Sequence, residues 1–231
     1  MKFGRFLAAA LLAGCALAAE ARNVYIHIAG DSVAASSSKR PRVGWGQAME
    51  LYVKPGYEMV NRAQSGSSTK KFRNGDRYEW KYLVKYIKPG DFLLIHFGHN
   101  NRYKNIPYIE YEDDLTFFIK EARKLGAQVV LVTPVEEWVF KDGEFVGGKE
   151  LKRYSEIVMD VAEAEKVPVI DLNKLSGELF AKLGAEESRK LFIPSDNSHF
   201  NLTGAKMMCE LIIRDAVRQK LPLAEAFKEL Q

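Results

Sequence analysis

The feature that most constrains this chain is a series of five short apolar runs, rich in Val, Ile and Phe. They cover residues 24–29, 57–61, 92–97, 128–133 and 168–172. Between them lie longer segments with helical spacing of apolar residues, at 46–53, 78–87, 108–125, 149–166 and 202–219. Continuous apolar strands that alternate with helices form βαβ units, in which helices cover both faces of a parallel sheet. The sequence therefore predicts an α/β fold with about five parallel strands.

Length and composition fit a single globular domain. The chain has 231 residues, of which 47% are apolar and 28% are charged, and no repeat or Pro/Gly-rich linker divides it. Such values are typical of one ordinary globular domain with a sizeable core. We expect this domain to cover residues 22–231.

Residues 1–21 have the pattern of a signal peptide. Two basic residues precede an uncharged run over 6–19, which is too short to span a bilayer, and small residues follow it. Cleavage after Ala18 or Ala21 would fit this pattern, and the alternative is a buried N-terminal helix. We therefore expect a secreted or periplasmic protein.

The sequence "LAGC", which ends at Cys15, resembles a bacterial lipoprotein box. This resemblance implies a signal that ends before Cys15 and a lipid anchor at the cell envelope. The first predicted strand begins near Val24, which leaves little spacer after a lipid, so both forms stay open. Cys209 lies in a helical apolar pattern, and we expect a small buried side chain without a disulfide.

Polar and Gly-rich segments follow the apolar runs, at the edge of a parallel sheet where ligands bind. Ser32 follows the first run in "GDS", Gly66 comes after the second, and Asn100 comes after the third. Asp196 and His199 stand three residues apart, shortly before the last long helix. These residue types are the ones that an ester hydrolase needs.

Hydrolysis through a covalent intermediate requires a nucleophile, a base, a group that orients the base, and oxyanion donors. Ser32 is the predicted nucleophile, because Gly30 allows a tight turn at the strand end. His199 is the predicted base, and Asp196 can reach its Nδ1 and leave Nε2 free. The predicted oxyanion donors are the backbone N–H groups of Ser32 and Gly66 and the Asn100 amide. The serines at 36–38 are expected to form loop.

These blocks resemble the GDSL or SGNH hydrolases, whose four motifs read here "GDS", "NRAQSG", "GHN" and "DNSH". Closer detail, in "GWGQ", "FGHN", "TPV" and "DNSHFN", is similar to the rhamnogalacturonan acetylesterase branch. The resemblance implies a flavodoxin-like three-layer α/β/α sandwich without a metal or an organic cofactor. It also implies removal of acetyl groups from pectic polysaccharide.

Two departures from that branch concern the substrate. Asn101 stands where the branch usually has Asp, which bears on loop anchoring and local charge. After "TPV" the branch tends to carry basic residues, whereas this chain has Glu136, Glu137 and Trp138. The sugar and the acetylated hydroxyl therefore stay open.

A metal site is the alternative for Asp196 and His199, in combination with His96 or His99. No HExxH or paired-His spacing supports it, so we expect no metal. His27 and His96 lie within apolar runs and are interpreted as hydrogen-bonded core histidines.

The net charge of +4 is unevenly placed, because nine cations follow the first three runs. They are Lys39, Arg40, Arg42, Lys70, Lys71, Arg73, Arg77, Arg102 and Lys104. A cationic rim would attract an anionic polysaccharide, and Lys70, Lys71 and Arg73 are the predicted substrate-binding residues. The alternative is a solvated basic face. No nucleic-acid-binding motif accompanies the charge, so we do not expect a nucleic-acid partner.

The sequence therefore predicts an exported serine esterase that removes acetyl groups from a plant cell-wall polysaccharide, with pectic rhamnogalacturonan as the first candidate. Two alternatives remain. A lipase or thioesterase of the same superfamily would use the same residues on longer acyl chains. A carbohydrate-binding surface protein could retain the fold without catalysis.

Overall fold

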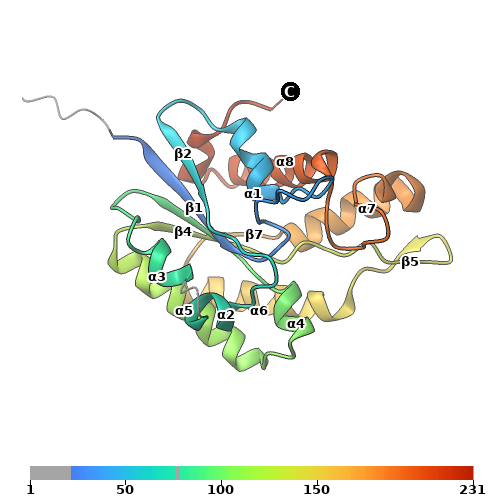
Figure 1. Cartoon of the computed structure of the whole chain (residues 1–231), viewed down its shortest axis with the longest axis horizontal. Coiled ribbons are helices and arrows are strands. Elements are labelled where there is room, and N and C mark those ends of the chain that lie inside the picture. The colour runs from blue at the N-terminus through green and yellow to red at the C-terminus, as the bar shows by residue number, and fades with distance from the viewer. Residues whose placement is uncertain (1–21, 76–78, 231) are drawn as a thin grey trace, which may run out of the picture.

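The computed structural model describes residues 22–75 and 79–230, so the predicted leader and Cys15 lie outside the described residues. Five parallel strands form one sheet in the order β2-β1-β3-β4-β7 (Figure 1). Their bounds are β1 Val24–Gly30, β2 Tyr57–Asn61, β3 Phe92–His96, β4 Gln128–Val132 and β7 Val169–Ile170. A small antiparallel pair consists of β5 Phe140–Lys141 and β6 Glu144–Phe145. The predicted parallel sheet of about five strands is confirmed.

Five predicted helices are present, and only α3 differs from its predicted bounds by more than one residue at an end. They are α1 Trp45–Ala48, which continues as a 3₁₀ helix over Met49–Tyr52, α3 Glu79–Leu83, α5 Tyr108–Lys124, α6 Lys149–Glu165 and α8 Leu202–Arg218. The structure adds α2 Thr69–Asn74, α4 His99–Tyr103, α7 Leu172–Arg189 and a 3₁₀ helix over Pro222–Ala226. Within the described ranges, none of these helices has the length and apolar character needed to cross a membrane.

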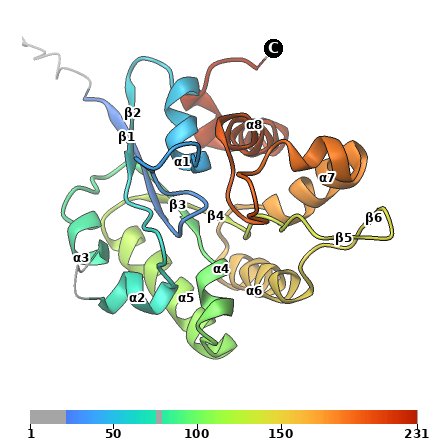
Figure 2. The ribbon, with the colours of Figure 1, turned by 45° about the vertical axis from the view of Figure 1, so that its right-hand side comes forward.

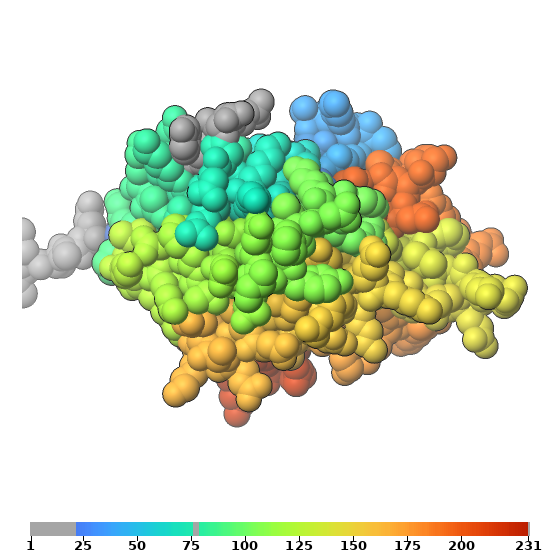
Figure 3. All heavy atoms as spheres, turned by 90° about the horizontal axis from the view of Figure 1, so that it is seen from below, coloured from blue at the N-terminus to red at the C-terminus, as the bar shows by residue number. Residues whose placement is uncertain are grey.

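Alternate side chains of each central strand pack on opposite faces of the sheet. In β3, Phe92 and Leu94 belong to the cluster on one face, and Leu93 and Ile95 belong to the cluster on the other. Helices α1, α7 and α8 cover the first face, and α2, α3, α5 and α6 cover the second (Figure 2). Figure 3 shows the green and gold spheres of α5 and α6 over this second face. The three-layer α/β/α sandwich is confirmed.

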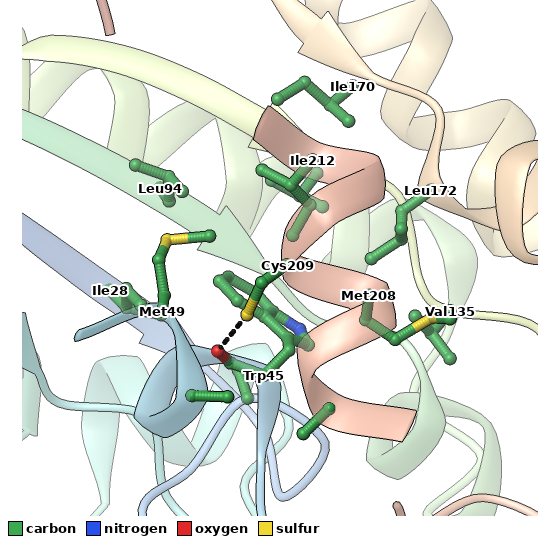
Figure 4. Close-up of a cluster of buried hydrophobic side chains, with 14 of the residues drawn as sticks. Ile28, Trp45, Met49, Leu94, Val135, Ile170, Leu172, Met208, Cys209 and Ile212 are labelled. Atoms are coloured by element: carbon green, nitrogen blue, oxygen red, sulfur yellow. Dashed lines mark hydrogen bonds between the residues drawn. The ribbon is translucent and has the colours of Figure 1, made fainter. Parts of the chain in front are cut away.

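The first core cluster holds Cys209, the free cysteine of the described chain (Figure 4). Its thiol donates a hydrogen bond of 2.8 Å to the backbone carbonyl of Trp45, which joins α8 to α1. Burial raises the pKa of this thiol well above its usual value, so it remains protonated. The predicted role of Cys209 as a small buried side chain is confirmed.

A buried carboxylate, Asp91, joins the start of β3 to β1. It accepts hydrogen bonds from the backbone N–H groups of Tyr25 (3.1 Å) and Lys88 (2.9 Å) and from the Arg22 guanidinium (2.8 Å). The His27 ring lies 3.3 Å from its second oxygen. Burial alone would raise the pKa of Asp91, but these hydrogen bonds together lower it below the usual value. The ionised carboxylate therefore stabilises the folded state.

We expect Asp91→Asn to lower the free energy of unfolding at pH 7 by about 1.5–3 kcal/mol, because charged hydrogen bonds of a buried group are lost. Because the pKa of Asp91 is lower in the folded than in the unfolded state, its carboxylate contributes its full stabilisation above about pH 4. This contribution is lost as the pH falls through the lower, folded-state pKa. Thermal unfolding measured from pH 7 to pH 2.5 should thus show that the difference in melting temperature between wild type and variant shrinks as the pH falls. Asp113→Asn, at an exposed position, is the matched control. A difference that stays constant with pH would contradict this linkage.

Candidate active site

Ser32 lies in a tight turn at the carboxyl end of β1. The carbonyl of Asp31 accepts hydrogen bonds from the backbone N–H groups of Ala34 and Ala35, and the Asp31 side chain accepts one from Val33 N–H at 3.0 Å. A Cβ at Gly30 would lie 2.8 Å from the His96 carbonyl of β3, so only glycine fits between the two strands. The turn therefore fixes the Ser32 backbone beside β3.

The three predicted catalytic side chains form a continuous chain of hydrogen bonds. Ser32 Oγ lies 2.8 Å from His199 Nε2, and His199 Nδ1 lies 2.6 Å from Asp196 Oδ2. The other oxygen of Asp196 accepts the backbone N–H groups of Ser198 (2.8 Å) and His199 (2.9 Å). With Nδ1 protonated toward Asp196, Nε2 is left to accept the Ser32 proton.

The environment keeps Asp196 ionised. Burial alone would raise its pKa, but hydrogen bonds from the Ser198 backbone, the His199 ring and the His199 backbone lower the pKa below its usual value. The carboxylate is therefore negative across the neutral pH range.

A hollow of about 500 Å³ opens over this chain of hydrogen bonds. It brings together the ends of β1, β3 and β4 and the turn before α8, and Ser32 at its base is only 7% exposed. Its lining residues are Ser32, Val33, His99, Asn100, Tyr103, Glu137, Val139, Ser195, Asp196, Asn197, Ser198 and His199. A substrate group in this hollow would therefore reach the Ser32 hydroxyl.

The predicted oxyanion donors are only partly brought together, because Gly66 is not among the residues that line the hollow. Asn100, the second residue of α4, lines the hollow together with Ser32. Gly66 has a φ of +74°, a backbone conformation that favours glycine. The Arg42 guanidinium donates to the Ser32 carbonyl (3.2 Å) and to Ser65 Oγ (3.0 Å), so it joins the nucleophile turn to the residue before Gly66.

Comparison with known proteins agrees with this geometry. The model of the GDSL-like lipase/acylhydrolase family matches residues 28–207, which include all four motifs. The chain belongs to this family. The predicted family and the prediction of a hydrolytic enzyme are thereby confirmed.

Among curated proteins, rhamnogalacturonan acetylesterase RhgT of Bacillus subtilis is 31% identical over 219 residues, 87% of this chain and 93% of RhgT. Probable rhamnogalacturonan acetylesterase YesY of the same organism is 31% identical over 213 residues, 87% of this chain and 96% of YesY. The crystal structure of B. subtilis YxiM matches with a TM-score of 0.76 and 27% identity. That match covers 87% of this chain and 58% of the YxiM chain. The named acetylesterases support the prediction of a carbohydrate acetylesterase.

Helix α7, which the sequence analysis did not predict, holds the turn that carries the predicted catalytic residues Asp196 and His199. Arg189 at its end donates to the carbonyls of Asp196 and Ile193, both at 2.9 Å. The Trp138 indole donates to Ser188 Oγ of α7 at 3.0 Å, and the Trp138 backbone N–H donates to the Asn197 carbonyl at 2.8 Å. The turn that carries Asp196 is therefore fixed from two sides.

The two glutamates that depart from the branch pattern face different surroundings. Glu137 lines the hollow and forms a bidentate ion pair with Arg102, with both distances 2.6 Å, and it accepts a hydrogen bond from Ser198 Oγ at 3.0 Å. Glu136 points to the backbone, where it accepts the N–H groups of Glu137 (2.9 Å) and Gly148 (2.7 Å). Both carboxylates therefore anchor the loop after β4 beside the catalytic turn.

Asn101 replaces the usual Asp of the branch and anchors a loop. It is fully buried, its amide donates to Thr69 Oγ1 at 2.8 Å, and its amide oxygen accepts the Thr69 backbone N–H at 3.2 Å. This reciprocal pair joins α4 to the start of α2, so Asn101 anchors the two helices to each other.

The predicted substrate-binding cations lie on α2, and none of them lines the hollow. Lys70 pairs with Glu110 at 2.9 Å, and Arg73 pairs with Asp114 at 3.0 Å. Lys71 is exposed. The structure thus separates these cations from the catalytic side chains, and their role in substrate binding stays a prediction.

A second polar cluster lies behind the nucleophile turn. Asp31, His96 and His99 are all buried, and their nearest donor atoms lie within 4.8 Å of one another. His99 Nδ1 is 3.5 Å from Asp31 Oδ2, and the His96 ring interacts with the backbone of Val132 and Thr133 at the end of β4. His96 is fully buried, as expected for a core histidine, and its ring meets the Trp45 ring edge-on.

The cluster has the residue types of a metal-binding site, namely two imidazoles and a carboxylate. Burial lowers the pKa of His96 to about 4, so its ring is neutral. The carboxylate of Asp31 has a lowered pKa because the His99 and His96 rings oppose the effect of burial. Ligand atoms around tetrahedral zinc lie roughly 3.3 Å apart, given bonds of about 2.0–2.1 Å, so the three side chains would have to move inward.

We expect the esterase activity to be unchanged after dialysis against EDTA, because the predicted mechanism through Ser32, His199 and Asp196 uses no cation. The measurement is initial rate on 4-nitrophenyl acetate, with metal content by mass spectrometry before and after dialysis. His96→Gln is the matched variant, since it removes one imidazole from the cluster of Asp31, His96 and His99. Loss of activity that one divalent ion restores would contradict this expectation.

Proposed function

We propose that this protein is an exported serine esterase that removes acetyl groups from an acetylated plant cell-wall polysaccharide, with pectic rhamnogalacturonan as the first candidate. The observation that carries the proposal is the hydrogen-bonded chain Ser32–His199–Asp196, with distances of 2.8 and 2.6 Å, at the base of an open hollow.

In the proposed acylation step, Ser32 Oγ attacks the carbonyl carbon of the acetyl ester while His199 Nε2 takes the Ser32 proton. The carbonyl oxygen becomes an oxyanion, which the backbone N–H groups of Ser32 and Gly66 and the Asn100 amide would stabilise. Asp196 stabilises the imidazolium that forms. The C–O bond to the sugar then breaks, and the sugar oxygen takes the proton from His199.

Deacylation repeats these roles with water as the nucleophile. His199 takes a proton from water, whose oxygen attacks the acetyl carbonyl of Ser32. The bond to Ser32 Oγ breaks, the hydroxyl regains its proton from His199, and acetate leaves. No group outside the described residues and water is needed for the proton balance.

The lining of the hollow favours a short acyl group over a long one. Most of its side chains are polar, and its apolar surface comes from Val33, Val139 and the ring of Tyr103. A long acyl chain would need a larger apolar wall. Tyr103 is 63% exposed at the rim and offers a ring face to a sugar. The names of RhgT and YesY support an acetylated carbohydrate as the substrate.

Export is the part of the proposal that rests on the sequence pattern of residues 1–21. Mass spectrometry of the mature protein from its native host should find a first residue near Ala19–Arg22, or an acylated Cys15 if the protein is anchored. Intact Met1 in exported protein would contradict both forms.

The test of the proposed function is acetate release from a panel of substrates with matched acetyl content. We expect release from acetylated rhamnogalacturonan and faster hydrolysis of 4-nitrophenyl acetate than of the octanoate ester. Faster hydrolysis of the octanoate ester would favour the lipase or thioesterase alternative. Binding of the polysaccharide without acetate release would favour the non-catalytic alternative.

We expect Asn100→Ala to lower kcat by about a hundredfold with little change in KM, because an oxyanion donor acts mainly in the transition state. Steady-state kinetics on 4-nitrophenyl acetate provides both constants. Asn197→Ala, which removes another amide from the lining of the same hollow, is the matched control. A change confined to KM would make Asn100 a substrate-binding residue instead.

A further inference from the structure

A second hollow, of about 610 Å³, lies on the other side of Arg42 from the nucleophile. Its polar lining includes Arg40, Arg42, Gln47 and Thr203. The two hollows are neighbours, because Arg42 donates to the Ser32 carbonyl at 3.2 Å and Val43 N–H donates to the Phe200 carbonyl at 2.9 Å. A polymer that places one unit over Ser32 can therefore place another in this hollow.

The arginines of this hollow differ from Arg73 and Arg102 in having no carboxylate partner among the described residues. Arg102 and Arg73 are paired with Glu137 and Asp114, whereas neither Arg40 nor Arg42 forms an ion pair with a described residue. Arg40 is exposed. Arg42 is half-buried. Its Nη2 donates hydrogen bonds to the Ser32 carbonyl and to Ser65 Oγ, and its Nε has no hydrogen-bond partner in the described chain. Two guanidinium groups are thus left to meet an anion.

The rest of the hollow suits a sugar ring. Leu51 and Leu202 line it and are 55% and 50% exposed, so their side chains are accessible to a ligand in the hollow. The flat apolar face of a pyranose ring can pack on such side chains, while its hydroxyls meet Gln47 and Thr203. The one carboxylate of the lining, Glu50, is exposed and leaves the local charge positive.

We propose that this second hollow binds a carboxylated sugar unit of the acetylated polymer, with its carboxylate between Arg40 and Arg42. Guanidinium groups bind carboxylates through paired hydrogen bonds in a fixed geometry, which lysine does not provide. The inference rests on the proposed function, because it names the part of the substrate that lies beside the acetylated unit. It also moves the anion-binding role from the cations of α2 to the loop before α1.

The first test compares two acetylated oligosaccharides of equal length, one with uronate carboxylates and one in which they are reduced to alcohols. Arg40→Gln should lower kcat/KM on the carboxylated substrate by about two- to fivefold, the range of one exposed ion pair. Arg40→Glu should lower it further. Both variants should act normally on the reduced substrate and on 4-nitrophenyl acetate, since Arg40 has no contact with Ser32. The loss should vanish in ~1 M salt, where screening acts over about 3 Å.

Lys70→Gln and Lys70→Glu are the matched controls, because they change the net charge equally at a cation paired with Glu110. They should leave both substrates unaffected. Equal losses of the Arg40 variants on carboxylated and reduced substrates would overturn the proposal. A loss that appears in the Lys70 variants and not in the Arg40 variants would overturn it in favour of the α2 cations.

A second test separates this inference from the proposed function. Calorimetry would measure binding of a deacetylated uronate oligosaccharide to the Ser32→Ala protein, with and without Arg40→Gln. Weaker binding in the double variant supports the subsite even if no acetylated carbohydrate proves to be a substrate. Equal binding in the two proteins overturns the subsite even if acetate release from polysaccharide is observed.

Discussion

Replacing Ser32 by alanine is expected to abolish ester hydrolysis, with kcat lowered by about 10⁴- to 10⁶-fold. The variant lacks the atom that attacks the carbonyl, and no other described hydroxyl lies within hydrogen-bond distance of His199 Nε2. The residual rate reflects binding and the oxyanion donors alone. Initial rates on 4-nitrophenyl acetate and on an acetylated oligosaccharide should fall together.

The fold should survive this substitution. The Ser32 side chain has one hydrogen bond, to His199, while the turn itself is held by the backbone and by the Asp31 carboxylate. Ser38→Ala is the matched control, because this exposed serine of the same loop has no hydrogen bond from its side chain in the described chain. It should retain full activity, and both variants should keep the wild-type melting temperature.

The covalent intermediate provides a second measurement. Wild-type protein mixed with 4-nitrophenyl acetate and quenched in acid should gain the mass of one acetyl group, located on the peptide that contains Ser32. The Ser32→Ala protein should gain none. An acetyl group on another residue, or substantial turnover by the folded variant, would exclude Ser32 as the nucleophile.

Much of the sheet could be predicted because its strands are buried on both faces. In β1 and β3 nearly every residue is apolar, so each strand stands out as one continuous run, and its bounds were predicted to within one residue. Helix α7 was missed for the opposite reason. Its sequence contains Gly177 and Gly184, and Gly184 has a φ of +76° at a kink, so the apolar spacing is interrupted.

The site shows a similar division between local and tertiary information. The residues that could be predicted, such as Ser32 and Asn100, follow strands directly, and strand ends converge on one edge of the sheet. Arg42 and Arg189 could not be predicted as supports of the site. Their partners are backbone carbonyls, a serine hydroxyl and the Asn197 side-chain oxygen, which carry no recognisable sequence pattern. The ion pairs of Lys70 and Arg73 with residues of α5 could not be predicted either, because they depend on how α2 packs against α5.

Asp196→Asn should have the second largest effect, a loss of about 10³- to 10⁴-fold in kcat with KM little changed. The amide oxygen can still accept the backbone N–H groups of Ser198 and His199, so the turn should keep its shape. The amide N–H₂ would then face His199 Nδ1 and donate to it. That contact favours the tautomer with the proton on Nε2, which cannot accept the proton of Ser32.

Asn197→Asp is the matched control for this last variant, since it makes the reverse change at the next residue of the same turn. Asn197 is exposed and its amide oxygen accepts from Arg189, a contact that a carboxylate would retain. We expect nearly normal kinetics for Asn197→Asp and a melting temperature close to wild type for both proteins. If Asp196→Asn instead kept its kcat, His199 would hold its tautomer without the carboxylate, and Asp196 would serve only to shape the turn.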